Sequence, residues 1–232
     1  MEKYPIMFLS GKNKENFMIN KLFYDVKKYG FRDVICNWLD TYDLSKLHYI
    51  QQYEHFEREN DQSTIWHKKF YQMIRSDESF NKVYVDFLKN IIKPKYNEEI
   101  VYQKIPTFRV HLPGNVSVGE FHKDKHYRDI EWAETVRETN YYIPLTKAYG
   151  TNTIWAETKE DKGDYKPFDS SYGECVEWDA SNLMHGNKDN VTSQTRVSFD
   201  FRVIPKSRYI NSNHLTINTK IPFGIGGYYD IA

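Results

Sequence analysis

The stretch Arg196-Val197-Ser198-Phe199-Asp200-Phe201-Arg202-Val203 alternates charged or polar residues with apolar ones. A period of two residues predicts a β-strand with one apolar face and one polar face. We expect the apolar face to pack beneath a layer of helices. The polar face carries charges that are costly inside a sheet sandwich unless they meet a ligand or a partner. A β-sandwich with a polar, ligand-filled interior accommodates both faces.

The first hundred residues are predicted to form a layer of helices. Residues 77–93 carry apolar side chains at i, i+3, i+4, i+7, i+8 and i+11, which is typical of a helix with one buried face. Pro94 ends this helix, because proline cannot continue the backbone hydrogen bonding. Residues 16–29 also have a helical pattern, with Gly30 as the C-terminal stop. Residues 4–9 are predicted to form a short strand.

Short segments with strand character follow Pro94, and turns rich in Gly, Pro and Asn separate them. These segments are residues 107–112, 116–122, 140–145, 152–157, 174–178 and 196–204. The first two flank the turn Pro113-Gly114-Asn115 and are predicted to form a hairpin. Short strands spaced in this way indicate an antiparallel sandwich or barrel.

Length and composition limit the possible classes of protein. The chain has 232 residues, and we expect one domain (1–232) with a helical flank (1–100), a β core (101–210) and a tail (211–232). Basic and acidic side chains balance at 32 each, which favours neither nucleic acid nor an anionic membrane as a partner. There are two cysteines, no secretory signal and no apolar segment long enough to span a membrane. These features predict a cytoplasmic protein, and they carry no signal of its oligomeric state.

Two histidines and one carboxylate form a candidate metal site. His122 and Asp124 make a His-x-Asp motif on a predicted strand end, so their side chains share a face, and His185 follows after several strands. Two imidazoles and one carboxylate suit a non-haem Fe(II) centre that keeps coordination positions open. Each histidine alone could instead be a core or surface residue, and Asp124 could cap the charged segment behind it. His126 is a rival ligand that would give a three-histidine site.

An arginine and a serine shortly after His185 form a candidate co-substrate site. Arg196 and Ser198 lie at the start of the last predicted strand. A guanidinium binds a carboxylate through two parallel hydrogen bonds, and a serine hydroxyl adds another donor. The alternative is a structural salt bridge between Arg196 and Asp200 or Glu157.

The region from about residue 108 to 205 resembles the 2-oxoglutarate/Fe(II) oxygenase superfamily, in particular its StrG-like branch from streptomycin biosynthesis. The similar segments are Leu112-Pro-Gly-Asn115, Val118-Gly-Glu-Phe-His-Lys-Asp124, Ile143-Pro-Leu-Thr146, Thr151-Asn-Thr-Ile-Trp155, His185-Gly-Asn187 and Thr195-Arg-Val-Ser-Phe-Asp-Phe-Arg202. The resemblance implies a double-stranded β-helix of the jelly-roll or cupin type, with the N-terminal helices packed on its major sheet. It also implies that His122, Asp124 and His185 bind Fe(II). The carboxylate of Asp124 argues against a halogenase, in which a small residue takes this place.

The same resemblance implies roles for four further residues. Arg196 would bind the distal carboxylate of 2-oxoglutarate, with Ser198 assisting. Asn140 and Tyr142 lie on a predicted strand where related proteins contact the co-substrate. Dioxygen would be the second co-substrate.

The expected activity is therefore that of a dioxygenase that hydroxylates a small polar metabolite and releases succinate and CO2. Two alternatives from other classes are a cupin-like metal protein without oxygenase activity and a metal-free β-sandwich that binds ligands. The charged segment 123–137 and the tail 221–232 are candidate covers for the pocket.

Overall fold

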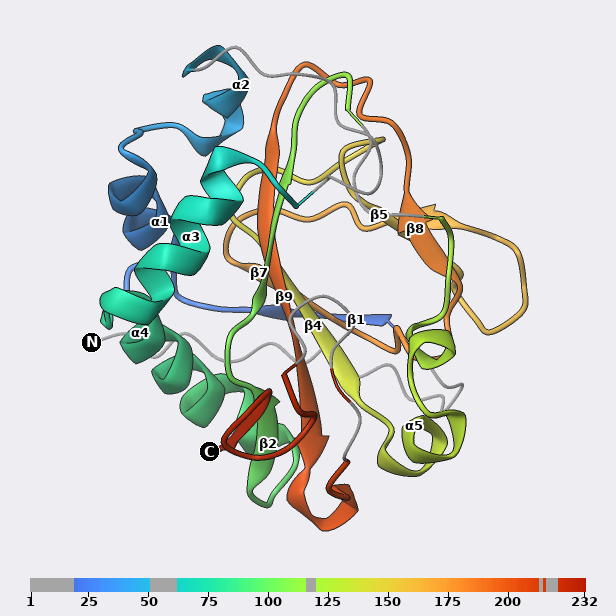
Figure 1. Ribbon diagram of the computed structural model, residues 1–232. Helices are drawn as coiled ribbons and strands as arrows, with labels where there is room; N and C mark the ends of the chain where they lie inside the picture. The colour runs from blue at the N-terminus through green and yellow to red at the C-terminus, as the bar shows by residue number, and fades with distance from the viewer. Residues whose placement is uncertain (1–18, 51–61, 116–119, 213–214, 216–220) are drawn as a thin grey trace, which may run out of the picture.

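Two antiparallel sheets and a layer of helices make up the computed structural model (Figure 1), which describes residues 19–50, 62–115, 120–212, 215 and 221–232. The helices are α1 (Phe31–Leu39), α2 (Leu47–Ile50), α3 (Ile65–Ser76), α4 (Ser79–Phe87) and α5 (Ile130–Val136). The strands are β1 (Ile19–Phe23), β2 (Ile100–Gln103), β3 (Thr107–His111), β4 (Thr139–Pro144), β5 (Ile154–Ala156), β6 (Lys166–Pro167), β7 (Glu174–Trp178), β8 (His185–Asn187), β9 (Arg196–Pro205) and β10 (Tyr229–Ile231). None of the described helices has the length and apolar content needed to cross a bilayer.

The two sheets face each other as a double-stranded β-helix. The major sheet has seven strands in the order β1-β7-β4-β9-β2-β10, and β3 pairs with β9 as well. The minor sheet has three strands in the order β6-β5-β8. Helices α1, α3 and α4 cover the outer side of the major sheet, whereas β5 and β8 lie on its other side (Figure 1). The predicted fold, including the helices on the major sheet, is confirmed.

Strand β9 is the centre of the major sheet. Its first half pairs with β3 and its second half with β2, while β4 runs along its other edge. The side chains of Phe199 and Phe201 are fully buried on the helical side, as predicted. The ring of Phe199 lies 5.0 Å from that of Phe31 in α1, and the ring of Phe201 lies 5.2 Å from that of Tyr84 in α4. These edge-on aromatic contacts join the helices to the sheet.

The predicted helix over residues 77–93 is interrupted. α4 ends at Phe87 and continues as a π-helical segment, Leu88–Ile92, and then as a short 3-10 turn, Lys93–Lys95. A π turn inserts one extra residue per turn and rotates the side chains that follow. Consequently Ile92 is fully buried, whereas Ile91, which belongs to the predicted stripe, is only partly buried.

The predicted helix over residues 16–29 is wrong. Ile19–Phe23 forms the edge strand β1, which pairs with β7, and Gly30 precedes α1 instead of ending a helix. The residues of β1 are partly or fully exposed at the sheet edge, so their apolar pattern does not report a buried helix face. The predicted strand at 4–9 lies outside the described residues.

The predicted hairpin is only partly testable, because residues 116–119 lie outside the described part of the chain. β3 pairs with β9, and His122 forms an isolated bridge with His185 of β8. His122, at the end of the predicted second strand, therefore joins the minor sheet through this bridge to β8.

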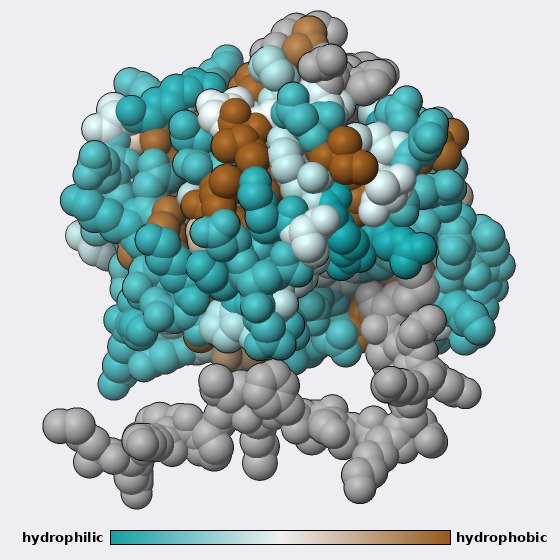
Figure 2. Space-filling view, turned by 90° about the horizontal axis from the view of Figure 1, so that it is seen from below, coloured by the Kyte–Doolittle hydropathy of each residue, from teal (hydrophilic) through white to brown (hydrophobic). Residues whose placement is uncertain are grey.

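The end of the chain also joins the sheet. β10 pairs with β2, and the backbone of Ala232 exchanges two hydrogen bonds with Ile100. On the face seen from below, hydrophobic side chains form small groups separated by hydrophilic surface (Figure 2).

Candidate metal centre

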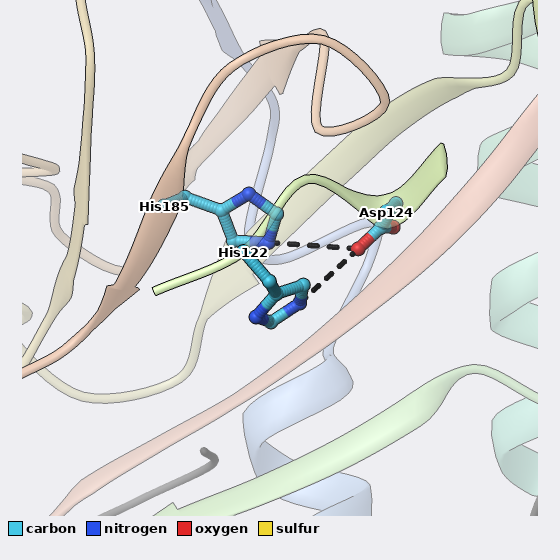
Figure 3. A group of neighbouring side chains, drawn as sticks. All are labelled: His122, Asp124 and His185. Atoms are coloured by element: carbon cyan, nitrogen blue, oxygen red, sulfur yellow. Dashed lines mark ion pairs between the residues drawn. The ribbon is translucent and has the colours of Figure 1, made fainter. Parts of the chain in front are cut away.

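His122, Asp124 and His185 meet at one point between the two sheets (Figure 3), with one ligand atom of each within 4.8 Å of the others. The Nε2 atoms of His122 and His185 lie 3.4 Å and 3.5 Å from the same oxygen, Oδ1 of Asp124. The backbones of the two histidines are joined by a pair of hydrogen bonds of 2.8 Å and 2.9 Å. This bridge fixes the spacing of the two imidazoles.

Both imidazoles are oriented by hydrogen bonds from their other ring nitrogen. The Nδ1 atom of His122 lies 2.9 Å from the carbonyl oxygen of Glu120, and the Nδ1 atom of His185 lies 2.9 Å from that of Leu183. A carbonyl oxygen only accepts, so Nδ1 carries the proton in both rings. Each Nε2 atom therefore points away from its carbonyl partner and toward Asp124, which is the usual orientation of histidine ligands.

Asp124 is ionised in this environment. Burial alone would raise the pKa of its carboxyl group, but the guanidinium of Arg202 outweighs burial and holds the pKa well below its usual range. An Arg202 Nη2 atom donates to Oδ2 at 2.6 Å, and the amide of Asn140 donates to the same oxygen at 3.4 Å. These donors occupy Oδ2 and leave Oδ1 directed at the histidines.

His185 is neutral because burial, the largest cause, lowers its pKa to about 4. Its ring packs edge-on against the indole of Trp178 at 4.6 Å. A neutral, buried imidazole is the form that binds transition metals.

The three residues line a cavity of about 520 Å³ between the sheets. The predicted co-substrate residues Asn140 and Arg196 line the same cavity. His126, the rival ligand, is exposed and lies outside the cluster of possible metal ligands.

Arg196 is fully buried, and its guanidinium donates hydrogen bonds to three groups among the described residues. Its Nε donates to the carbonyl oxygen of Asn152 at 2.9 Å, Nη1 to Ser198 Oγ at 2.9 Å and Nη2 to Asn187 Oδ1 at 3.1 Å. The two carboxylates considered as salt-bridge partners are engaged elsewhere. Asp200 pairs with Arg109, and Glu157 accepts hydrogen bonds from backbone amides such as that of Gly163.

Tyr142, unlike Asn140, does not line the cavity. It is fully buried in a second hydrophobic cluster, where its ring packs 6.2 Å from that of Phe168. Its hydroxyl has no hydrogen-bond partner in the described part of the chain. A buried hydroxyl without a partner is rare, and a ligand or a water usually satisfies it.

Two features of the centre were not assigned from the sequence. The first is Arg202, the ion-pair partner of Asp124, whose Nη1 also donates to Gln103 at 3.2 Å and Tyr228 at 3.1 Å. Its place on the polar face of β9 was the available signal. The second is Gly186, where a Cβ atom would lie 2.8 Å from the ring and 3.2 Å from the Cα atom of Phe121.

No family model matches the chain. The structure resembles the non-haem alpha-ketoglutarate-dependent carbocyclase SnoK from nogalamycin biosynthesis, with 9% identity, 85% of each chain covered and a TM-score of 0.49. It also resembles EctD from S. alaskensis, solved with 2-oxoglutarate and 5-hydroxyectoine, with 13% identity, 91% of this chain and 77% of that chain covered and a TM-score of 0.47. Both structural similarities are distant. The streptomycin biosynthesis protein StrG from Streptomyces griseus is 34% identical over 210 residues, which cover 90% of this chain and 96% of StrG. The chain therefore belongs to the StrG family, as its motifs predict.

Proposed function

We propose that this protein is an Fe(II)- and 2-oxoglutarate-dependent dioxygenase that hydroxylates a C–H bond of a small polar metabolite and releases succinate and CO2. The observation that carries the proposal is the convergence of two Nε2 atoms and one carboxylate oxygen in a cavity that also contains a buried arginine. Iron with 2-oxoglutarate bound would supply the oxidising chemistry, with dioxygen as the oxidant.

The donor set fits Fe(II). His122, Asp124 and His185 offer two imidazole nitrogens and one carboxylate oxygen, and two histidines with one carboxylate leave coordination positions open for further ligands. The hydrogen bonds from both Nδ1 atoms and the ion pair of Asp124 fix these donors before any metal binds.

The cavity also fits a dicarboxylate co-substrate. The guanidinium of Arg196 would bind the distal carboxylate, with Ser198 beside it as a second donor. Asn140 would contribute a further polar contact, because its side-chain oxygen is buried and has no hydrogen-bond partner among the described residues. Tyr142 does not line this cavity, so the contact predicted for it has no support from the cavity lining.

The protein would contribute binding, orientation and exclusion of water. Trp178 and Ile154 place apolar surface beside the metal ligands in the cavity wall. The second candidate, a cupin-like metal protein without oxygenase activity, would share the three ligands but gain nothing from Arg196. A metal-free binding module would gain nothing from the three converging ligands.

The test is an anaerobic titration of the metal-free protein with Fe(II) and 2-oxoglutarate, followed by the visible metal-to-ligand charge-transfer band. We expect a band in the wild type, no band in His185→Ala, and a band that needs far more 2-oxoglutarate in Arg196→Ala. Arg208→Ala removes an exposed arginine and should match the wild type.

Each other outcome identifies a different protein class. Bound iron without a band would favour the cupin-like alternative. Absence of Fe(II) binding in the wild type would favour the metal-free binding module.

A further inference from the structure

The cavity is rich in positive charge. Among the described residues that line it, five are arginines and two are aspartates. The arginines are Arg75, Arg109, Arg128, Arg196 and Arg202. Arginine is the side chain best suited to bind carboxylates and phosphates, because its planar fork matches their oxygens.

Three of the five arginines already have assigned partners. Arg202 pairs with Asp124 at 2.6 Å, and Arg128 pairs with the buried carboxylate of Glu138 at 3.2 Å. Arg196 is assigned to 2-oxoglutarate in the proposed function. Two arginines remain: Arg109, which pairs with Asp200 through Nε only, and Arg75.

Arg109 is the more informative of these two. It lies on β3 opposite Ser198, and its Nε atom donates to Asp200 Oδ1 at 3.4 Å. Its Nη1 atom is buried and has no hydrogen-bond partner among the residues that the structure describes. Buried donors almost always have a partner, and a cationic donor without one indicates a missing acceptor. Asp200 holds one edge of this guanidinium and leaves Nη1 for a ligand.

Arg75 lies at the edge of the same cavity. It is an exposed residue in the last turn of α3, and it forms no ion pair with any of the described residues. An exposed arginine contributes less to affinity than a buried one, because water and salt screen its charge. Its contribution is to attract an anion to the opening.

We propose that the prime substrate carries a carboxylate or a phosphate group that Arg109 binds inside the cavity, with Arg75 assisting at the edge. This inference rests on the proposed function, because only an enzyme of that class would use the bound anion as its substrate. It adds a second anion site to the one assigned to the co-substrate, so that 2-oxoglutarate and the substrate bind together without exchanging places.

The test is calorimetric titration of the metal-free protein with phenyl phosphate and with benzoate, which differ only in the anionic group, and with benzyl alcohol as the neutral probe. Each titration is repeated with saturating 2-oxoglutarate. We expect one of the two anions to bind, with benzyl alcohol at least about tenfold weaker, since a hydrogen bond to a charged group is worth this much. The tighter anion identifies the substrate group as a phosphate or a carboxylate.

Variants assign the site. Arg109→Gln should weaken the preferred anion by about tenfold or more, Arg109→Lys by less, and Arg75→Gln by a few-fold. Arg208→Gln should have no effect, and the thermal unfolding midpoints show whether each variant is folded. Arg109→Lys keeps a charge beside Asp200, so it remains informative if Arg109→Gln does not fold.

The proposal is overturned if binding is unchanged in both Arg109 variants, or if 2-oxoglutarate displaces the anion completely. Failure of the proposed function gives a different result, namely no charge-transfer band in the wild type with Fe(II) and 2-oxoglutarate. The two measurements use different ligands and therefore fail independently.

Discussion

The two faces of β9 are both buried but have opposite chemistry. On the helical side, Phe199 and Phe201 are fully buried among aromatic rings. On the cavity side, Arg196 and Asp200 are also nearly inaccessible, yet they carry charge. The helical side gains stability from apolar area and close packing. The cavity side must pair each charge, which gives it little net stability but a fixed arrangement of donors. Burial alone therefore does not distinguish the core from the site.

The largest effect should come from removing the carboxylate at the centre of the cavity side. In Asp124→Ala we expect Fe(II) affinity to fall by more than about 100-fold. Mutating a residue that only hydrogen-bonds to a metal ligand already lowers metal affinity by about 10–100-fold, and Asp124 would be a ligand itself. The partly buried guanidinium of Arg202 also loses its shortest ion pair but keeps its contacts with Glu138 and Asp200, so the free energy of unfolding should fall by about 1–3 kcal/mol. Metal titration and urea denaturation measure the two effects.

Asp189→Ala serves as the matched control, because Asp189 is exposed. Retained Fe(II) affinity in Asp124→Ala would show that the carboxylate is not a ligand.

The helical side should respond in stability alone. Phe199→Ala leaves a cavity between α1, α4 and β9, and it should lower the free energy of unfolding by about 3–5 kcal/mol. At low temperature, where the variant is still folded, Fe(II) affinity should change little. Phe23→Ala, on the edge strand β1 where the ring is 61% exposed, is the control and should cost much less. An equal loss of metal affinity and stability in Phe199→Ala would contradict the separation of the two faces.

Arg202 tests whether residues that contact the candidate ligands, without binding metal themselves, also determine metal affinity. Arg202→Gln removes the charge beside Asp124 and should weaken Fe(II) binding by about 10–100-fold. Arg202 also donates to the hydroxyl of Tyr228, close to β10. Truncation before Tyr228 should therefore weaken metal binding as well, whereas a tail that acts only as a cover would affect coupled turnover and spare the metal. Metal titration of both variants separates the two roles.

The close approach of β8 to Phe121 should have a moderate effect. In Gly186→Ala the new Cβ atom would lie 2.8 Å from the Phe121 ring, so Phe121 and the neighbouring His122 must shift. We expect Fe(II) affinity to fall by a few-fold and stability by about 1–3 kcal/mol. Gly30→Ala is the control, because its nearest atom is a flexible carboxylate oxygen at 3.3 Å. Unchanged metal affinity in Gly186→Ala would mean that Phe121 moves without moving His122.

Most of the helical side of β9 could be predicted from the sequence, because apolar periodicity reports burial directly. The sequence also predicted that His122, Asp124 and His185 lie together and that Arg196 shares their cavity, because the four residue types in this order form a recognisable set. β1 could not be predicted, because Ile19–Phe23 is a partly exposed edge strand whose pairing with β7 depends on residues far along the chain. The π segment after Phe87 has no sequence signal, and it moves the buried position to Ile92.

The partners of the polar side chains were the least predictable part of the site. Arg202 and Asp124 are 78 positions apart, and only the topology brings them together. Tyr142 illustrates the same limit, because its strand was predicted while its position outside the cavity lining was not.

The last expected effect is a pH dependence of the folding stability, to which residues on both sides of β9 contribute. Burial, the largest cause, holds the pKa of both His67 and His111 at about 3, while in the unfolded chain a histidine titrates near its ordinary value of about 6.5. The ring of His67 lies 5.8 Å from that of Phe108, and His111 lies opposite Arg196 in the backbone pairing of β3 with β9. Below pH 6.5 the unfolded chain binds more protons, so stability is present above this pH and falls as the pH decreases toward 3.

Each histidine should contribute about 1.4 kcal/mol per pH unit to this loss. Urea denaturation of the metal-free protein at pH 7, 6 and 5 measures the slope, and His67→Gln should reduce it by the contribution of one histidine. Because the described contacts of His67 are with Thr64 and Phe108 and not with His122, Asp124 or His185, the same variant should leave Fe(II) affinity at pH 7 unchanged. A slope that stays the same in His67→Gln would mean that His67 binds protons in the folded protein as readily as in the unfolded chain. The imidazole would then be charged at low pH although it packs against Phe108.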